Sequence, residues 1–215
     1  MDVVNALEPE PEAAQHVFGE RLDVVRAFAD ALARHGEERG LIGPLELPRL
    51  WTRHILNSAV IAPLFRGRVG DVGSGAGFPG LVLAIVRPDV EFVLIEPMER
   101  RVAWLNEQVA ALGLENVTVD RARAEDWGGR GSLDGVTARA VSALRTLISL
   151  TAPLVRSGGE LILMKGAGAP AEIDAAAKQI RRFGLSDVRV EVVGAELLAE
   201  PTRVVRATVA GPSGR

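Results

Sequence analysis

The residues VGDVGSGAGFPG, from Val69 to Gly80, decide the fold of this chain. They begin as an apolar strand, are interrupted by the glycines Gly73, Gly75, Gly77 and Gly80, and lead into LVLAIV, a run typical of a buried helix. Glycine adopts positive φ at little steric cost, and its missing Cβ lets a ligand approach the main chain, so we expect both at these four positions. A strand, a tight turn and a helix N-terminus together predict a nucleotide-binding corner. The structural alternative is a turn that only packs the strand against the helix.

The glycine turn fits two cofactor motifs. Read from Gly75, GAGFPG fits the G-x-G-x-x-G of a dinucleotide site, with Gly80 as its third glycine. Read from Gly73, with Asp71 before it at the strand end, DVGSGAG is similar to the first motif of S-adenosylmethionine-dependent methyltransferases. A dinucleotide fold usually starts with this strand, whereas about seventy residues precede it here. That position favours the methyltransferase motif.

The composition predicts one α/β domain with a small N-terminal extension. With 215 residues, of which 47% are hydrophobic, the chain is long enough to bury a single core. It has no cysteine, which excludes disulfides and thiolate chemistry, and its three histidines (His16, His35 and His54) are scattered, so we expect no metal site. No apolar run approaches the length of a membrane span, and the first residues do not resemble a signal peptide. We therefore expect a cytoplasmic protein.

The charge limits how this chain can bind nucleic acid. Its formal net charge is −3, so any such contact must come from a local basic face. Of the 25 basic residues only Lys165 and Lys178 are lysines. Arginine suits planar, bidentate contacts to phosphates and base edges. A biased genome composition explains the same excess of arginine equally well.

The N-terminal third is expected to be helical. Apolar residues three and four positions apart predict one amphipathic helix over residues 13–35. A loop containing prolines leads to a second helix over residues 47–65, whose apolar side should pack onto the rest of the chain. We therefore divide the chain into an N-terminal helical extension, residues 1–65, and a main domain, residues 66–215.

The main domain alternates strands with helices, which predicts a mostly parallel sheet covered on both faces. After the glycine turn we expect helices over residues 98–113, 144–159 and 170–183. We expect strands over residues 90–96, 116–126 (with its following turn), 133–141, 160–166, 188–194 and 202–209, the last two forming an antiparallel end.

Two further segments fall at the ligand-binding edge of this sheet. Glu96 closes the strand after the glycine turn, where an acid can accept hydrogen bonds from both hydroxyls of a ribose. NAD and S-adenosylmethionine both carry a ribose, so Glu96 does not distinguish them, and an exposed glutamate at a helix start is the structural alternative. Arg123, Ala124 and Glu125 follow the third strand at the same edge, where they could bracket an adenine.

Four segments together carry a family resemblance: DVGSGAGFPG, RAE, ARAVSAL and MKG. Over about residues 15–209 the chain resembles the bacterial small-subunit ribosomal RNA guanine-N7 methyltransferases of the RsmG or GidB type. The resemblance implies a class I, Rossmann-like methyltransferase with a mostly parallel seven-stranded sheet, which uses S-adenosyl-L-methionine to methylate N7 of guanine 527 in the 530 loop of 16S ribosomal RNA. The implied cofactor-binding residues are Gly73, Phe78, Ala124, Glu125 and Arg139, to which the turn and the second strand add Gly75, Gly77 and Glu96.

The chain departs from the family pattern at two positions. Glu96 stands where the family commonly has aspartate, a change that a ribose contact tolerates. Ala138 stands where the family has the serine of SRA, so a hydroxyl is missing.

Methylation of guanine N7 needs little acid or base catalysis, because N7 already carries a free lone pair. The enzyme must mainly hold the base in line with the methyl group and exclude water. Arg139 and Lys165 each follow the end of an expected strand, on the ligand side of the sheet, and are our candidates for orienting the guanine. A structural ion pair is the alternative for each. Arg53, His54 and Arg203 are weaker candidates for RNA contact.

Three other functions remain open from the sequence. A small-molecule methyltransferase shares the fold, and an NAD-dependent reductase shares the glycine turn. A non-enzymatic ribosome-assembly factor would bind RNA and use the cofactor only for stability. The expected partner is 16S ribosomal RNA or the 30S particle, without a metal or a membrane.

Overall fold

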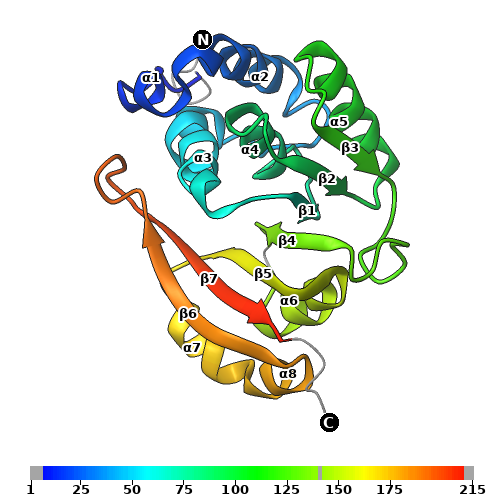
Figure 1. Cartoon of the computed structure of the whole chain (residues 1–215). Coiled ribbons are helices and arrows are strands. Elements are labelled where there is room, and N and C mark those ends of the chain that lie inside the picture. The colour runs from blue at the N-terminus through cyan, green and yellow to red at the C-terminus, as the bar shows by residue number, and fades with distance from the viewer. Residues whose placement is uncertain (1–6, 140–141, 211–215) are drawn as a thin grey trace.

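Seven strands form one sheet in the computed structural model, which describes residues 7–139 and 142–210 (Figure 1). The strands are β1 (Arg68–Val72), β2 (Glu91–Ile95), β3 (Val117–Asp120), β4 (Leu133–Ala138), β5 (Val155–Lys165), β6 (Leu185–Val193) and β7 (Thr202–Val209). Their order is β3-β2-β1-β4-β5-β7-β6, with β1 to β5 parallel and β7 antiparallel to both of its neighbours. The predicted mostly parallel sheet with an antiparallel end is confirmed.

The order of the strands places the glycine turn at the centre of the sheet. β1 lies between β2 and β4, so the chain leaves β1 in one direction for β2 and later returns to the other side for β4. Ligands of open α/β sheets bind at such a switch point, beyond the carboxyl ends of the strands. The turn that follows β1 therefore lies where the topology favours a ligand.

Helices cover both faces of the sheet. They are α1 (Ala13–Phe18), α2 (Leu22–His35), α3 (Asn57–Ala59), α4 (Gly80–Val86), α5 (Glu99–Ala111), α6 (Leu144–Thr151), α7 (Ala169–Ala175) and α8 (Ala177–Arg182). Figure 1 shows α1 to α3 beside α4 and α5, with α6 to α8 on the other side. Side chains of β5 point alternately to the two faces of the sheet. Ile162 and Met164 pack in the core under the N-terminal helices, and Leu161 and Leu163 pack in the core under α6.

The N-terminal helices are less regular than the sequence predicted. The single helix expected over residues 13–35 is broken at Gly19, whose φ of 49° ends α1 before α2 begins. The helix expected over residues 47–65 starts with a 3-10 turn, continues as the π-helix Leu50–Leu56 and ends in another 3-10 turn at Ala62–Leu64. Apolar spacing does not reveal a π-helix, because the wider turn shifts the register only locally.

Two other boundaries were wrong. The helix expected over residues 144–159 ends at Thr151, because Pro153 has no N–H to continue it, and residues from Val155 onward belong to β5. The helix expected over residues 170–183 is divided at Ala176 into α7 and α8. The strand expected over residues 133–141 is confirmed as far as Ala138, and residues 140–141 lie outside the described part.

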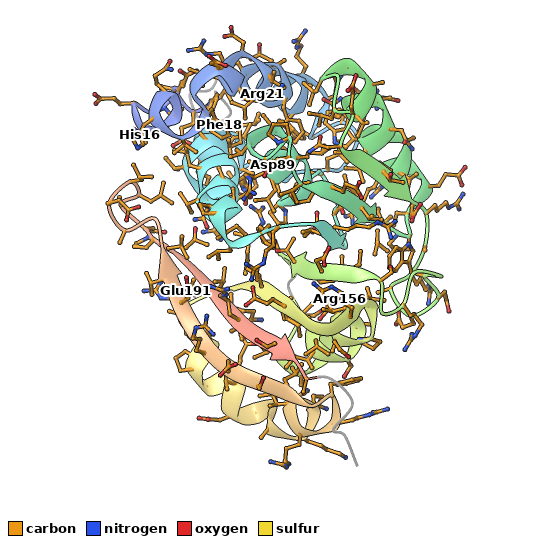
Figure 2. All side chains as sticks on the ribbon, viewed as in Figure 1. His16, Phe18, Arg21, Asp89, Arg156 and Glu191 are labelled. Atoms are coloured by element: carbon orange, nitrogen blue, oxygen red, sulfur yellow. The ribbon has the colours of Figure 1, made fainter. Side chains whose placement is uncertain are left out.

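Side chains across the antiparallel end form a row of ion pairs. Arg206 of β7 contacts Glu160 of β5 at 2.9 Å and Glu191 of β6 at 3.0 Å, and Glu191 is labelled in Figure 2. These contacts tie the three strands together. The same end of the sheet is joined to the N-terminal segment by Thr202, whose hydroxyl donates to the main-chain oxygen of Asn57 at 3.0 Å.

The N-terminal helices share a hydrophobic core with the rest of the chain. Phe28 of α2 contacts the ring of Phe78 in the glycine turn, with 5.6 Å between centroids. The division into an extension of residues 1–65 and a main domain of residues 66–215 stays a prediction, and these buried contacts join the two parts.

A buried carboxylate connects β1 to α4. Asp71 is fully buried, and its Oδ2 accepts a hydrogen bond from the N–H of Gly80 at 3.0 Å. Gly80 does not adopt the positive φ that we expected, because it is the first residue of α4. It must be glycine for lack of space: a Cβ there would lie 2.5 Å from Oδ2 of Asp71 and 2.3 Å from Cδ2 of Leu94.

We predict that Gly80→Ala destabilises the protein by about 1–3 kcal/mol, because the added methyl group overpacks a buried contact. Urea unfolding followed by circular dichroism measures the change. Gly128→Ala is the matched control, since a Cβ at Gly128 meets nothing within 4 Å and its φ is not positive. Equal unfolding midpoints for the two variants would contradict the tight packing between β1 and α4.

Candidate active site

The glycine turn presents main chain to open space at two of its glycines. Gly73, Gly75 and Gly77 have φ values of 74°, 57° and 108°. A Cβ at Gly73 would meet no atom within 4 Å, and one at Gly75 would only approach a main-chain oxygen at 3.8 Å. At Gly77 a Cβ would lie 2.5 Å from Leu81, so this glycine serves internal packing. The positions open to a ligand are therefore Gly73 and Gly75.

Glu96 fixes the turn to the end of β2. Its side chain is buried, with Oε2 accepting from the N–H of Gly75 at 2.9 Å and Oε1 accepting from the N–H of Met98 at 3.0 Å. The alternative of an exposed glutamate at a helix start is therefore wrong. Each carboxylate oxygen has a second lone pair, so a ribose hydroxyl can still be accepted. That ribose contact stays a prediction.

The end of β3 is hydrogen-bonded to the main chain of Glu96. The main-chain oxygen of Asp120 accepts from the N–H of Glu96 at 3.1 Å. Ala124 is buried, whereas Glu125 is exposed. Trp127, which we did not single out from the sequence, is buried and donates its indole N–H to the Asp120 carboxylate at 2.7 Å. Two features of the sequence could have identified Trp127. Aromatic residues make up only 4% of the chain, and this one follows the RAE segment closely.

Three buried polar atoms near the ends of β1 and β4 have no hydrogen-bond partner among the described residues. They are Oδ1 of Asp71, Oγ1 of Thr137 and Nη1 of Arg139. Asp71 and Thr137 are direct neighbours in the β1–β4 register. Burial raises the pKa of Asp71 to about 7, partly opposed by the hydrogen bond from Gly80 and by the charge of Arg139. An unpaired buried polar group costs about 1–3 kcal/mol, so polar groups of a ligand fit here.

Arg139 is held from the side of the N-terminal segment. One of its guanidinium nitrogens, Nη2, donates to Nδ1 of His54, whose Nε2 lies 2.5 Å from Oε2 of Glu46. The guanidinium lies over the ring of Phe78, 4.9 Å from its centroid. Burial lowers the pKa of Arg139 to about 10, so it is charged at neutral pH. Phe78, predicted to bind the cofactor, is buried between Phe28 and this group.

Lys165 forms the ion pair that we weighed as its alternative role. Its Nζ lies 2.8 Å from Oε2 of Glu172 and donates to the main-chain oxygen of Ser142 at 2.9 Å. Glu172 also accepts from the N–H of Leu144 at 2.8 Å. These contacts fasten the start of α6 to α7. The proposed role of Lys165 in orienting guanine stays a prediction.

One cleft of about 830 Å³ brings the predicted RNA-side residues together. It is lined by Arg53 of the π-helix, Arg139 directly after β4, Lys165 at the end of β5 and Arg203 of β7. His54 lines the same cleft. The sequence analysis named these five residues separately, and the fold brings them together in the lining of one cleft. Glu46, Glu172 and Glu200 line the same cleft, so four cations face three carboxylates and the lining has a formal charge of 4 − 3 = +1. A basic face for RNA therefore stays a prediction.

The described residues give no support for a metal or a membrane span. Within residues 7–139 and 142–210, no three His, Cys, Asp or Glu side chains are grouped so as to hold a metal ion. In that same part of the chain, no helix has the length and apolar composition needed to cross a bilayer. His16 and His35 are exposed and distant in sequence from His54.

Comparisons with solved structures identify the fold. An S-adenosylmethionine-dependent O-methyltransferase from Thermotoga maritima aligns with a TM-score of 0.57 at 16% identity, covering 80% of this chain and 72% of that one. TYW2 from P. horikoshii, in complex with MeSAdo, aligns with a TM-score of 0.60 at 13% identity, covering 73% and 62%. At these identities the likeness shows the fold alone, and it confirms the predicted class I methyltransferase fold.

Sequence relatives are much closer. Ribosomal RNA small subunit methyltransferase G of Leifsonia xyli subsp. xyli is 66% identical over 208 residues, which cover 96% of this chain and 100% of the relative. The protein of the same name from Paenarthrobacter aurescens is 55% identical over 212 residues, covering 98% of each. The family model GidB, rRNA small subunit methyltransferase G, matches residues 21–200. The chain belongs to this family.

Proposed function

We propose that this chain transfers the methyl group of S-adenosylmethionine to N7 of guanine 527 in 16S ribosomal RNA. The observation that carries the proposal is the cleft in which Arg53, Arg139, Lys165 and Arg203 meet. Through Arg139 this cleft adjoins Phe78 of the glycine turn. A base held in the cleft would thus lie next to a cofactor held by the turn, as family membership leads us to expect.

The residues around the turn fit S-adenosylmethionine, which supplies an electrophilic methyl group when bound. The open main chain at Gly73 and Gly75 leaves room for it, and Glu96 has lone pairs left for the ribose. Its amino-acid end carries an ammonium and a carboxylate, which complement the unpaired Oδ1 of Asp71 and Nη1 of Arg139. Gly77 and Phe78 would support the turn by packing against Leu81 and Phe28, and Ala124 and Glu125 would flank the adenine.

The side chains of the cleft hold the base and exclude water, and none needs to remove a proton, since N7 is already nucleophilic. Arg139 stays charged and can donate to guanine O6 or to a phosphate. Arg53 is exposed and Arg203 half-buried at the cleft, where phosphates of the RNA would pass. The 30S particle as the natural substrate, and the cytoplasmic location, belong to this proposal.

Transfer of radiolabelled methyl groups to 30S particles and to free 16S ribosomal RNA tests the function, with chemical cleavage at 7-methylguanine locating the product. Calorimetry with S-adenosylhomocysteine and NAD identifies the cofactor class. We expect label at guanine 527 and no binding of NAD. Label elsewhere would overturn the assigned position, and cofactor and RNA binding without transfer would favour an assembly factor.

We predict that Glu96→Gln weakens binding of S-adenosylhomocysteine by about 1–3 kcal/mol, because one amide cannot accept from two main-chain N–H groups and from a ribose. Isothermal titration calorimetry measures the dissociation constant. Glu99→Gln is the control, with the same loss of charge at a side chain that is 77% exposed and paired with Arg121. An unchanged dissociation constant in Glu96→Gln would refute the ribose contact.

We predict that RNA affinity falls steeply with salt, while cofactor affinity barely changes. Counterions released from phosphates give a linear log-log dependence, and Arg53→Ala and Arg203→Ala should each reduce its slope by roughly one. Filter binding at several salt concentrations measures the slope. Arg181→Ala, an exposed arginine on α8 outside the cleft, should leave it unchanged. A flat salt response would favour a small-molecule substrate instead.

We predict that Arg139→Ala and Lys165→Ala reduce methyl transfer more than RNA binding. Arg139→Ala should do so because the guanidinium lies over Phe78 of the glycine turn and also lines the cleft proposed for the base. Lys165→Ala should do so because Glu172 and Ser142 lose their partner next to the cleft. Single-turnover rates and RNA dissociation constants, compared for each variant, separate the two effects. Rates that match the unmodified protein would remove both residues from the site.

A further inference from the structure

His54 lies at the junction of the N-terminal segment, the glycine turn and the cleft. It belongs to the π-helix Leu50–Leu56, and only 7% of it is exposed. Its ring lies 5.3 Å from that of Phe78, between centroids. Both ring nitrogens have partners, Arg139 on Nδ1 and Glu46 on Nε2. Both ring nitrogens of this buried histidine are hydrogen-bonded, and the ring lies beside Phe78 of the site. These contacts point to a function for His54 within the site.

We infer that His54 is a positioning residue, which fixes the guanidinium of Arg139 and so makes the N-terminal helical segment part of the active site. This inference rests on the proposed function for its effect on the reaction rate. It does not rest on it for the contact between the two side chains. The sequence alone suggested His54 only as a candidate for direct RNA contact.

The contact with Arg139 determines the protonation of the ring. An arginine only donates hydrogen bonds, so Nδ1 must present its lone pair, and a neutral ring must then carry its proton on Nε2. Glu46 accepts that proton's hydrogen bond. Burial, followed by the charge of Arg139, lowers the pKa of His54 to about 4, so the ring is neutral at physiological pH. Glu46, bound also by Arg49, therefore selects the tautomer that can hold Arg139.

The two ends of the guanidinium then serve different purposes. Nη2 is occupied by His54, whereas Nη1 is buried without a partner among the described residues. Holding one nitrogen fixes the plane and direction of the other, which can meet a cofactor carboxylate or guanine O6 without first losing rotational freedom. The main chain at His54 is itself anchored, because the hydroxyl of Ser58 donates to its oxygen at 2.6 Å.

Two substitutions separate the two bonds of the ring. In His54→Asn, the side-chain oxygen reaches the position of Nδ1 and can still accept from Arg139. In His54→Gln, the longer side chain reaches the position of Nε2 and keeps the bond to Glu46. We expect kcat to stay within a few-fold in the Asn variant and to fall at least about tenfold in the Gln variant. KM for RNA should change little in either variant.

A second measurement does not depend on methyl transfer. In ¹⁵N-labelled protein, a held guanidinium gives separate Nη signals, while a freely rotating one gives averaged signals. We expect separate Arg139 signals in the unmodified protein and in His54→Asn, and averaged signals in His54→Gln. His35→Asn, an exposed histidine at the end of α2, is the control and should alter neither readout.

Equal losses of kcat in the Asn and Gln variants, or averaged Arg139 signals in the unmodified protein, would overturn the positioning role. A loss confined to thermal stability in both variants would also overturn it. If the unmodified protein transfers no methyl group to ribosomal RNA, the proposed function fails. The Arg139 signals would then still decide whether His54 holds the guanidinium.

Discussion

Two buried carboxylates hold the main chain of the glycine turn, and the site depends on these two anchors. Asp71 at the end of β1 accepts from Gly80 at the start of α4, and Glu96 at the end of β2 accepts from Gly75. A turn rich in glycine has few side chains of its own with which to fix its course. Because the carboxylates come from adjacent parallel strands, the sheet register itself determines the shape of the pocket.

The same site is completed from outside the sheet. Phe78 of the turn packs on Phe28 of α2 and lies under Arg139, while His54 approaches Arg139 from the π-helix. The N-terminal helices are thus more than a cover for the hydrophobic face of α4. A truncation that removed them would expose Phe78 and release the guanidinium at the same time, so their contributions to stability and to the site cannot be separated by deletion.

The sequence predicted those features that depend on local chemistry. The glycine spacing identified the turn, and strand-helix alternation identified the sheet and the edge at which Glu96, Arg139 and Lys165 would lie. It missed the break at Gly19 and the π-helix, which apolar spacing does not reveal, and it missed the burial of His54, which depends on distant contacts. No spacing rule reveals that His54 meets a residue 85 positions later, because that contact exists only once β4 is paired with β1.

The raised pKa of Asp71 lets this buried carboxyl group keep a proton close to neutral pH. Its pKa moves from 3.8 to about 7 on burial, so between these values the folded chain holds a proton that the unfolded chain has lost. Over that interval the free energy of unfolding falls as the pH rises, since the folded state binds more protons. A cationic group arriving beside Asp71 favours the carboxylate and expels the proton. Near neutral pH, the heat of cofactor binding would therefore depend on the ionisation enthalpy of the buffer.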